Sequence, residues 1–292
     1  MKQPDKWRET MDPFSLKFNN FNLKEIVGYP HAGNDVFYVR GIGKEEQEIT
    51  AFLKVERQKN ADIEREVLIV KKLKFSFLPS ILDYSFNVPK YILTKEVEGE
   101  RLSSILGNNE SMESLKYMEA YGELLAKIHN AKIERIPVKV RDFTIPHEFY
   151  VHNELEYIEQ YLLKTKFEET KCFIHGDCHY ANVLWKDYKV SCLLDYELSG
   201  YGSREYDLAW ALVLRPGQRF LQTEKERRVF LESYRKHHSF SKEAFDYYMV
   251  LFGIFFYKIS MSTENEDYRN SLIDMINDII LGRKLNKYNQ NI

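Results

Sequence analysis

The chain has 292 residues, with 42 basic and 44 acidic side chains and a formal charge of −2. Apolar residues make up 44% of the sequence and aromatic residues 14%, which excludes intrinsic disorder for most of the chain, because disordered segments lack such side chains. The nearly balanced charge gives no electrostatic reason to expect nucleic acid as a partner.

The three cysteines, Cys172, Cys178 and Cys192, are too few, and odd in number, for a disulfide framework, so we expect a reducing compartment. The polar N-terminus shows no signal-peptide pattern. The most apolar late stretch, Tyr247–Ile259, is interrupted by a lysine and is shorter than the roughly 20 residues of a membrane helix. We therefore expect a monomeric cytoplasmic protein with no membrane partner.

The strand signals lie early in the chain. Short β-rich runs at Val36–Arg40 and Ile49–Glu56 are separated by glycines and charged residues, which predicts a hairpin. In the second run, strand alternation puts Lys54 on the opposite face from Leu53. A further strand is predicted at Tyr91–Val97.

Helical periodicity begins after the hairpin and dominates the second part of the chain. Apolar residues recur at helical spacing from Ile63 to Leu73, behind the cap candidates Asn60 and Asp62. Early strands followed by late helices predict an α+β fold in two parts. Further helices are predicted at Leu115–Ile128 and Leu155–Leu162, and as three segments between about 222 and 282.

Three short strands are predicted among the later helices, at Lys171–Asp177, Asn182–Lys186 and Lys189–Asp195. Carboxylates and histidines stand at the ends of these strands. Strand ends and the loops beyond them are where a rigid scaffold presents reactive groups, so we expect the functional site here.

The segment from His175 to Asn182 reads His-Gly-Asp-Cys-His-Tyr-Ala-Asn, and Asp195 follows at the end of an apolar strand. Asp177 and Asn182 are five residues apart, the spacing of the protein-kinase catalytic loop, in which the aspartate takes the hydroxyl proton and the asparagine holds magnesium. Asp195 stands where the second metal-binding aspartate of such enzymes stands. Carboxylate and amide oxygens are the hard ligands that magnesium prefers.

These residues resemble the aminoglycoside phosphotransferase and choline kinase superfamily, whose members share a kinase-like fold. The resemblance implies a bilobal protein-kinase-like fold: an N-terminal nucleotide-binding lobe at 1–97, with an antiparallel sheet plus a helix, and a mainly helical catalytic and substrate-binding lobe at 98–292. The motifs that carry it are His-Gly-Asp-x-His-x-x-Asn at 175–182, Leu-Asp-x-Glu at 194–197, Tyr-Asp-Leu-Ala at 206–209 and Leu-Ala-x-x-His at 125–129.

The resemblance also implies roles for single residues. Asp177 matches the catalytic aspartate, and Asn182 and Asp195 match the magnesium ligands. Lys54 resembles the phosphate-binding strand lysine and Glu66 its partner on the following helix, so we expect these two to form an ion pair.

The nucleotide-binding backbone is implied in the same way. Lys95 and Val97 belong to the segment that resembles the hinge, whose backbone grips the nucleotide base. Gly28 and Gly33 bound a loop that offers backbone donors to phosphate, although their spacing is not the Gly-x-Gly-x-x-Gly of protein kinases.

The reaction implied is magnesium-dependent transfer of the γ-phosphoryl group of ATP or GTP to a hydroxyl group of a small molecule. Aminoglycosides come first among the acceptors, with antibiotic resistance as the biological role, and choline, homoserine and macrolides are the alternatives. Acidic residues such as Glu154, Glu159 and Glu205 would suit a polycationic acceptor.

Two alternatives from other classes remain open. A zinc-dependent hydrolase would use His175, Asp177 and His179 as ligands, with a neighbouring cysteine, but it leaves the asparagine and the second aspartate unexplained. An inactive kinase-like binding module is disfavoured because every expected catalytic position is filled. In the kinase interpretation, His175 is a structural residue with Asp207 as its partner.

Overall fold

The computed structural model describes residues 10–30, 33–59, 61–107, 111–263 and 265–282. The chain divides into two compact units, one made of Met1–Glu98 with Cys192–Leu198 and the other of Gly99–Ser191 with Ser199–Ile292. The fold is α+β, as predicted, with an antiparallel sheet in the first unit and mainly helices in the second.

The first unit is built on a five-stranded antiparallel sheet with strand order β1-β2-β3-β5-β4. The predicted hairpin is present as β2 and β3. The strand predicted at Tyr91–Val97 is β5, but it ends two residues earlier. The elements of this unit are a short 3₁₀ turn at Pro13–Ser15, β1 (Phe21–Gly28), β2 (Asp35–Gly43), β3 (Glu48–Val55), α1 (Ile63–Lys72), β4 (Ile81–Ser85) and β5 (Tyr91–Lys95).

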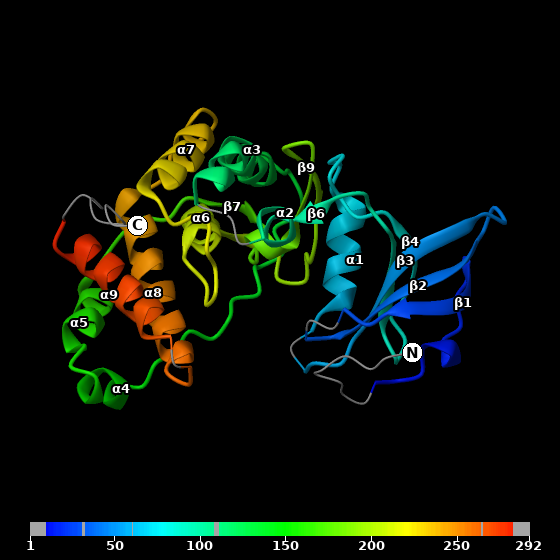
Figure 1. Cartoon of the computed structure of the whole chain (residues 1–292), viewed down its shortest axis with the longest axis horizontal. Helices are drawn as coiled ribbons and strands as arrows, with labels where there is room; N and C mark the ends of the chain where they lie inside the picture. The colour runs from blue at the N-terminus through cyan, green and yellow to red at the C-terminus, as the bar shows by residue number, and fades with distance from the viewer. Residues whose placement is uncertain (1–9, 31–32, 60, 108–110, 264, 283–292) are drawn as a thin grey trace. The chain divides into compact units, whose positions relative to one another are not determined.

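The two faces of this sheet bury different partners. On one face Leu53 packs in a core cluster with Phe37 and Val39, all with no exposed surface. The opposite face carries Lys54 and lies against α1, which Figure 1 shows beside the sheet. The alternation predicted within β3 is therefore confirmed, and it turns Lys54 toward the helix.

Helix α1 begins where its sequence predicts. The side chain of Asp62 accepts a hydrogen bond from the backbone N–H of Arg65 at 3.1 Å, so Asp62 is the N-cap; Asn60 lies outside the described residues. Ile63, Glu66, Val67 and Val70 are buried on one stripe of the helix. Glu66 therefore shares the face that packs on the sheet.

The second unit is mainly helical. The strand predicted at Lys171–Asp177 ends at Ile174. The strand predicted at Asn182–Lys186 begins at Val183, because Asn182 still belongs to a 3₁₀ turn. The residues between these two strands form a loop. The last two residues of β9 belong to the first unit. The elements are β6 (Glu100–Arg101), α2 (Leu102–Leu106), α3 (Ser111–His129), α4 (His147–His152), α5 (Glu156–Lys164), β7 (Lys171–Ile174), a 3₁₀ turn (Tyr180–Asn182), β8 (Val183–Lys186), β9 (Lys189–Leu193), β10 (Gly200–Ser203), α6 (Arg204–Leu212), α7 (Glu224–Arg235), α8 (Lys242–Ser260) and α9 (Glu266–Ile280).

Helix α6 is the centre of this unit. Every residue from Glu205 to Leu212 is buried, and α6 packs on α8, which in turn packs beside α9 (Figure 1). Helices α7, α8 and α9 are the three predicted between 222 and 282. None of the helices in the described ranges is both long and apolar enough to span a bilayer. The burial of α6 makes it a rigid base for the loop that follows β7.

Candidate functional site

Lys54 lies among three carboxylates within the first unit. Its Nζ atom is 2.9 Å from Glu66 Oε2, 2.9 Å from Asp195 Oδ1 and 3.3 Å from Glu197 Oε2. The ion pair predicted between Lys54 and Glu66 is thus present. Their side chains are 17% and 6% exposed, so this pair is largely removed from water. One ammonium among three carboxylates leaves an excess of negative charge.

The charges of this group shift the pKa values of its members. Burial by itself lowers the pKa of Lys54, but the carboxylates of Glu66, Asp195 and Glu197 outweigh burial and raise that pKa well above its ordinary value. Burial raises the pKa of Glu66 and of Glu197, against the lowering effect of Lys54. Lys54 is therefore charged at neutral pH, whereas these two glutamates hold a proton more tightly than they would in water.

Local backbone structure brings the two acidic residues after β9 to the lysine. Leu193 donates its N–H to the carbonyl of Phe77 at 2.9 Å, which ties the strand end to the first unit. Asp195 then has a φ of 69°, in the left-handed region that few residues other than glycine, asparagine and aspartate adopt. Glu197 Oε2 accepts the backbone N–H of Asp62 at 3.5 Å.

The donor set fits the magnesium ion that the sequence resemblance implies. Within the described ranges, Glu66, Asp195 and Glu197 form the only group of three His, Cys, Asp or Glu side chains whose ligand atoms all lie within 4.8 Å of one another. All three offer carboxylate oxygens, the ligands of magnesium, whereas structural zinc sites favour nitrogen and sulfur. The excess negative charge would be neutralised by a divalent cation.

The predicted phosphate-loop glycines lie at the end of β1 and after it. A Cβ atom at Gly28 would meet only the Tyr38 Cβ atom, at 3.9 Å, so the packing there does not demand glycine. Gly33 has a φ of 88°, a conformation that does favour glycine. The two residues before Gly33, at 31 and 32, lie outside the described part of the chain.

The predicted hinge lies at the end of β5. The N–H of Lys95 donates to the carbonyl of Ser80 at 2.8 Å, and the N–H of Glu96 donates to the carbonyl of Thr50 at 3.0 Å. These two amides are therefore engaged by the sheet. Val97, which is half-buried, follows immediately.

Asp177 belongs to the second unit, and both of its carboxylate oxygens have partners. The Nε1–H of Trp210 donates to Oδ1 at 2.8 Å, and Nη2 of Arg141 lies 2.7 Å from Oδ2. His179 Nε2 is 3.8 Å from Oδ1. The side chain is 10% exposed, so its orientation is set by these groups rather than by water.

The loop that carries Asp177 is held by α6. Asp207, fully buried on that helix, accepts the backbone N–H groups of His175 at 2.7 Å and Gly176 at 2.8 Å. The predicted contact between His175 and Asp207 is thus made by the histidine backbone, while the His175 ring Nδ1 accepts the N–H of Asp177 at 3.2 Å. His129, the last residue of α3, places Nε2 3.3 Å from Asp207 Oδ2.

The other end of the loop is closed by its own side chains. Asn182 Nδ2 donates to the carbonyl of Asp177 at 2.9 Å, and His179 Nδ1 accepts the N–H of Ala181 at 3.3 Å. Because the amide nitrogen of Asn182 is bound inside the loop, Oδ1 is the Asn182 atom that can serve a cation.

Sequence reasoning missed Arg141 and Trp210. Trp210 had a usable signal, since it lies three residues after Asp207 and therefore on the same face of a helix. Arg141 had none, because it lies in the connection between α3 and α4, which has no strand or helix periodicity.

The connection that carries Arg141 is anchored on β10. Tyr201 donates its N–H to the carbonyl of Ile136 at 2.6 Å, and Val138 donates its N–H to the carbonyl of Tyr201 at 3.4 Å. A Cβ atom at Gly200 would come within 2.5 Å of the Val138 nitrogen. The close approach of the two backbones therefore requires glycine at this position.

The zinc-hydrolase alternative finds no support. His175, Asp177 and His179 do not form a group with metal-ligand spacing in the described part of the chain. All three cysteines are buried and unpaired, and burial raises the pKa of Cys172 to about 12. A protonated buried thiol is a poor metal ligand.

Comparison with known proteins supports the kinase interpretation at the level of the family. The model of the "Phosphotransferase enzyme family" matches residues 26–240. No curated protein matches the sequence.

Solved structures of several phosphotransferases share this fold. A thermostable mutant of aminoglycoside phosphotransferase APH(4)-Ia, in a ternary complex with AMP-PNP and hygromycin B, is 14% identical with a TM-score of 0.61, over 91% of this chain and 94% of that chain. Macrolide 2'-phosphotransferase MphH from Brachybacterium faecium is 15% identical with a TM-score of 0.53, over 90% and 94%. A choline/ethanolamine kinase family protein from Mesorhizobium loti is 14% identical with a TM-score of 0.54, over 91% and 88%. The predicted kinase-like fold is confirmed.

Proposed function

The chain belongs to the phosphotransferase enzyme family, and on this premise we propose that it transfers the γ-phosphoryl group of ATP or GTP to a hydroxyl group of a small molecule. The observation that carries the proposal is the position of Lys54, whose Nζ atom lies 2.9 Å from both Glu66 and Asp195. A strand lysine paired with a helix glutamate is the arrangement that kinases use to hold nucleotide phosphates.

The residues of the first unit are assigned to the nucleotide. Lys54 contacts its phosphates, and Glu66 holds the lysine side chain in place. Gly28 and Gly33 are assigned to the phosphate loop. The backbone of the Lys95–Val97 segment is assigned to the base. Within this segment Val97 is the donor, because the N–H groups of Lys95 and Glu96 already bond to Ser80 and Thr50.

The magnesium ligands in this proposal are Asn182 and Asp195, each of which offers an oxygen atom. Glu197 lies in the same carboxylate group as Asp195 and offers another. When bound, the cation neutralises charge on the phosphate oxygens. The protein's own contribution is that each unit holds its own ligand oxygens in place before the nucleotide arrives.

Asp177 aligns the acceptor hydroxyl. The acceptor oxygen forms a bond to the γ-phosphorus as the bond from that phosphorus to the β,γ-bridging oxygen breaks, and the nucleoside diphosphate leaves with the electron pair. The hydroxyl proton is released toward the Asp177 carboxylate. Since Trp210 and Arg141 fix both carboxylate oxygens, the aspartate is already oriented for this role.

The acceptor is a small hydroxylated compound in this proposal. The sequence resemblance puts aminoglycosides first, and one solved structure with this fold holds hygromycin B. Choline, homoserine and macrolides remain the alternatives within the family.

Nucleotide turnover tests the proposed function directly. The purified chain is incubated with ATP or GTP, with magnesium or zinc, and with a mixed panel of hydroxylated acceptors, and both nucleoside diphosphate and phosphorylated acceptor are measured. We expect magnesium-dependent transfer that Asp177→Asn removes. Nucleotide binding without turnover would instead support an inactive binding module, and zinc-dependent hydrolysis without nucleotide would support a hydrolase.

A further inference from the structure

Positive charge gathers around Asp177. The guanidinium carbons of Arg141 and Arg215 lie 4.7 Å and 4.8 Å from the centre of the Trp210 ring, and the Nε1–H of that ring donates to Asp177. Two guanidinium groups thus flank the ring that binds Asp177, while the buried carboxylate of Asp207 is bonded to the backbone N–H groups of His175 and Gly176. Among Asp177, Trp210, Arg141 and Arg215, cations outnumber carboxylates.

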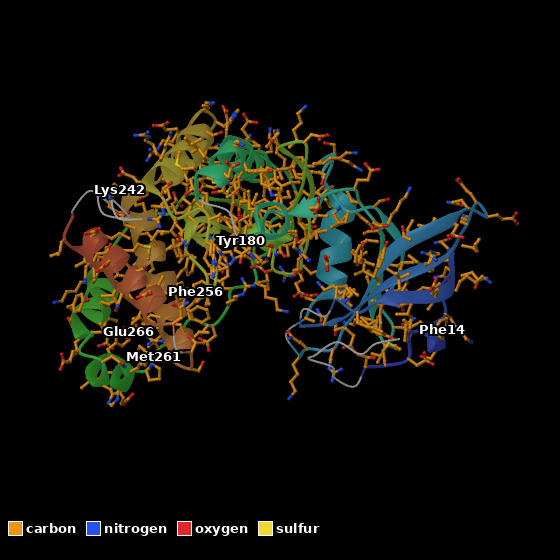
Figure 2. All side chains as sticks on the ribbon, viewed as in Figure 1. Phe14, Tyr180, Lys242, Phe256, Met261 and Glu266 are labelled. Atoms are coloured by element: carbon orange, nitrogen blue, oxygen red, sulfur yellow. The ribbon has the colours of Figure 1, made fainter. Side chains whose placement is uncertain are left out.

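Arg215 contributes a buried charge whose hydrogen bonds go to backbone carbonyls, and Asp177 lies near enough to stabilise it electrostatically. Its Nη atoms donate to the carbonyls of Val213 at 3.2 Å and Trp210 at 2.9 Å, and no carboxylate of the described residues lies within 4.0 Å of its guanidinium. The group also lies 5.6 Å from the ring centre of Phe256, which Figure 2 labels on α8. Burial lowers the pKa of Arg215, but an arginine keeps its charge at neutral pH.

Arg141 is the accessible member of the group. Its side chain is 30% exposed, against 10% for Asp177. A guanidinium carries five N–H donors, and those of Arg141 contact Asp177 Oδ2 at 2.7 Å and the carbonyl of Gly176 at 3.4 Å. Arg141 therefore retains donors for a ligand that approaches Asp177.

One of the acidic residues expected to attract a polycation, Glu205, serves the fold instead. Glu205 is fully buried and accepts the N–H of Thr170, the hydroxyl of Ser203 and the N–H of Ser241. Its carboxylate oxygens are thereby bonded to groups of the second unit. Among these candidates, Glu205 therefore offers nothing to a cationic acceptor.

The aromatic rings beside Asp177 are also occupied. A cage for a quaternary ammonium group needs ring faces that are open to the cation. Trp210 already has two guanidinium groups near its ring, and Phe256 has one. An acceptor of the choline kind would have to displace them.

We propose that Arg141 determines acceptor specificity by binding an anionic group of the acceptor, which is then a hydroxylated carboxylate or phosphate compound. This inference rests on the proposed function, because it assumes that the acceptor hydroxyl binds at Asp177. A guanidinium binds carboxylate and phosphate with two parallel hydrogen bonds, so it can hold such a group while Asp177 aligns the hydroxyl. Arg141 takes no part in the bond changes. The charge of the site thus points away from aminoglycosides.

Acceptors of matched shape and different charge test the proposal. One set is gluconate, glucitol and 1-amino-1-deoxyglucitol, which are anionic, neutral and cationic on the same carbon chain. A second set is glycerate, glycerol and 3-aminopropane-1,2-diol, with glycerol 3-phosphate as the phosphate compound. Binding is measured by calorimetry and by Trp fluorescence, and transfer from ATP is measured as KM and kcat. We expect each anionic compound to bind about 10- to 100-fold more tightly than its cationic counterpart.

Substitutions identify Arg141 as the source of the preference. Arg141→Gln should reduce the anionic-over-neutral preference about tenfold, mainly through Kd and KM, and Arg141→Lys should retain part of it. Arg135→Gln is the matched control, since Arg135 belongs to the same connection but lies over the ring of Tyr201 at 4.9 Å. The control should keep the full preference.

The outcomes separate this inference from the proposed function. Preference for the cationic compounds, equal binding of all charges, or no saturable binding of any anionic compound overturns the role of Arg141. Equal loss for every acceptor in Arg141→Gln also overturns it, because the residue would then only position Asp177. None of these results affects the proposed function, which fails only if magnesium-dependent transfer from nucleotide is absent for every acceptor class.

Discussion

The groups around Lys54 and Asp177 have opposite compositions. In the first unit one ammonium lies among three carboxylates, whereas in the second unit one carboxylate lies beside two guanidinium groups. In each group the central charge has a partner of opposite sign, and further charges of that opposite sign lie beside it. The difference teaches that carboxylates outnumber cations around Lys54, which suits a cation, whereas guanidinium groups outnumber the carboxylate they contact around Asp177, which suits an anion.

The excess charge is most accessible at one residue in each group. Asp195 is 32% exposed and Arg141 is 30% exposed, while Glu66 and Asp177 are 6% and 10% exposed. An excess charge that is fully buried would be costly, since its loss of hydration would not be repaid. We therefore expect ligands to contact Asp195 and Arg141 first.

The largest effect is expected from Asp177→Asn. The variant keeps the shape of the side chain and loses its charge, so turnover should fall about 10²- to 10⁴-fold while nucleotide affinity changes by no more than a few fold. Steady-state kinetics and nucleotide titration by calorimetry measure the two quantities. Near-normal turnover would show that the second unit does not hold the reacting carboxylate.

Asp195→Ala tests the negative excess of the first unit. Removing this carboxylate should abolish transfer and weaken magnesium-dependent nucleotide binding at least about tenfold, because the variant loses an oxygen ligand. Nucleotide titrations with and without magnesium measure the effect, and zinc should not restore activity. Tightly bound zinc in the purified protein, lost on substitution of Asp177, would contradict the assignment.

Lys54→Met should lower stability in a pH-dependent way. Glu66, whose side chain is 6% exposed, would lose its counter-charge, so we expect the free energy of unfolding to fall by about 1–3 kcal/mol at neutral pH. Without Lys54 the folded-state pKa of Glu66 rises further above its unfolded value. Stability from the bound proton is then fully present below the ordinary glutamate pKa and is lost as pH rises through the raised folded pKa.

The deficit of Lys54→Met should therefore shrink as the solution is acidified toward the ordinary glutamate pKa. Denaturant unfolding at several pH values measures it, with the exposed Lys24→Met of β1 as the control. A deficit of equal size across the whole range would show that the lysine does not compensate Glu66.

Some residues of both charge groups could be predicted from the sequence, and others could not. The pair of Lys54 and Glu66 could be predicted because strand alternation and helix spacing, both local rules, determine which face each side chain takes. Asp177 and Asn182 followed from a motif of fixed spacing. Arg141 could not be predicted, because its position depends on a backbone approach between its connection and Gly200, which no local rule describes.

The loop ends were missed for a similar reason. The strand predicted to reach Asp177 stops at Ile174 because Asp207 binds the next two backbone amides and Gly176 turns with a φ of 79°. The apolar pattern of β7 carries no trace of this interaction. Strands β1 and β4 were also not predicted, since register shifts interrupt the alternation of β1 and the buried residue of β4 is the polar Asp83.

The smallest effect is expected at the pair of the exposed His147 and the half-buried Glu159, which lies outside both charge groups. Glu159 Oε2 is 2.7 Å from His147 Nδ1, and this carboxylate raises the pKa of the histidine. The pair's contribution is fully present below the ordinary histidine pKa and is lost as pH rises through the raised value.

His147→Gln should therefore lower Tm slightly at about pH 6 and leave it unchanged at about pH 9. Thermal unfolding of the two proteins at both values measures this, and transfer activity should be unaffected. A change in acceptor preference would mean that α4 belongs to the acceptor site.

Asp207 should make the opening of the loop that carries Asp177 slow. The amides of His175 and Gly176 belong to no strand or helix, yet they donate to a carboxylate that has no exposed surface. Their hydrogens can exchange with deuterated solvent only when α6 and the loop separate, an opening that breaks the core of the second unit. These two loop amides should thus exchange as slowly as the interior of α6, so Asp177 stands next to one of the slowest-opening parts of the second unit.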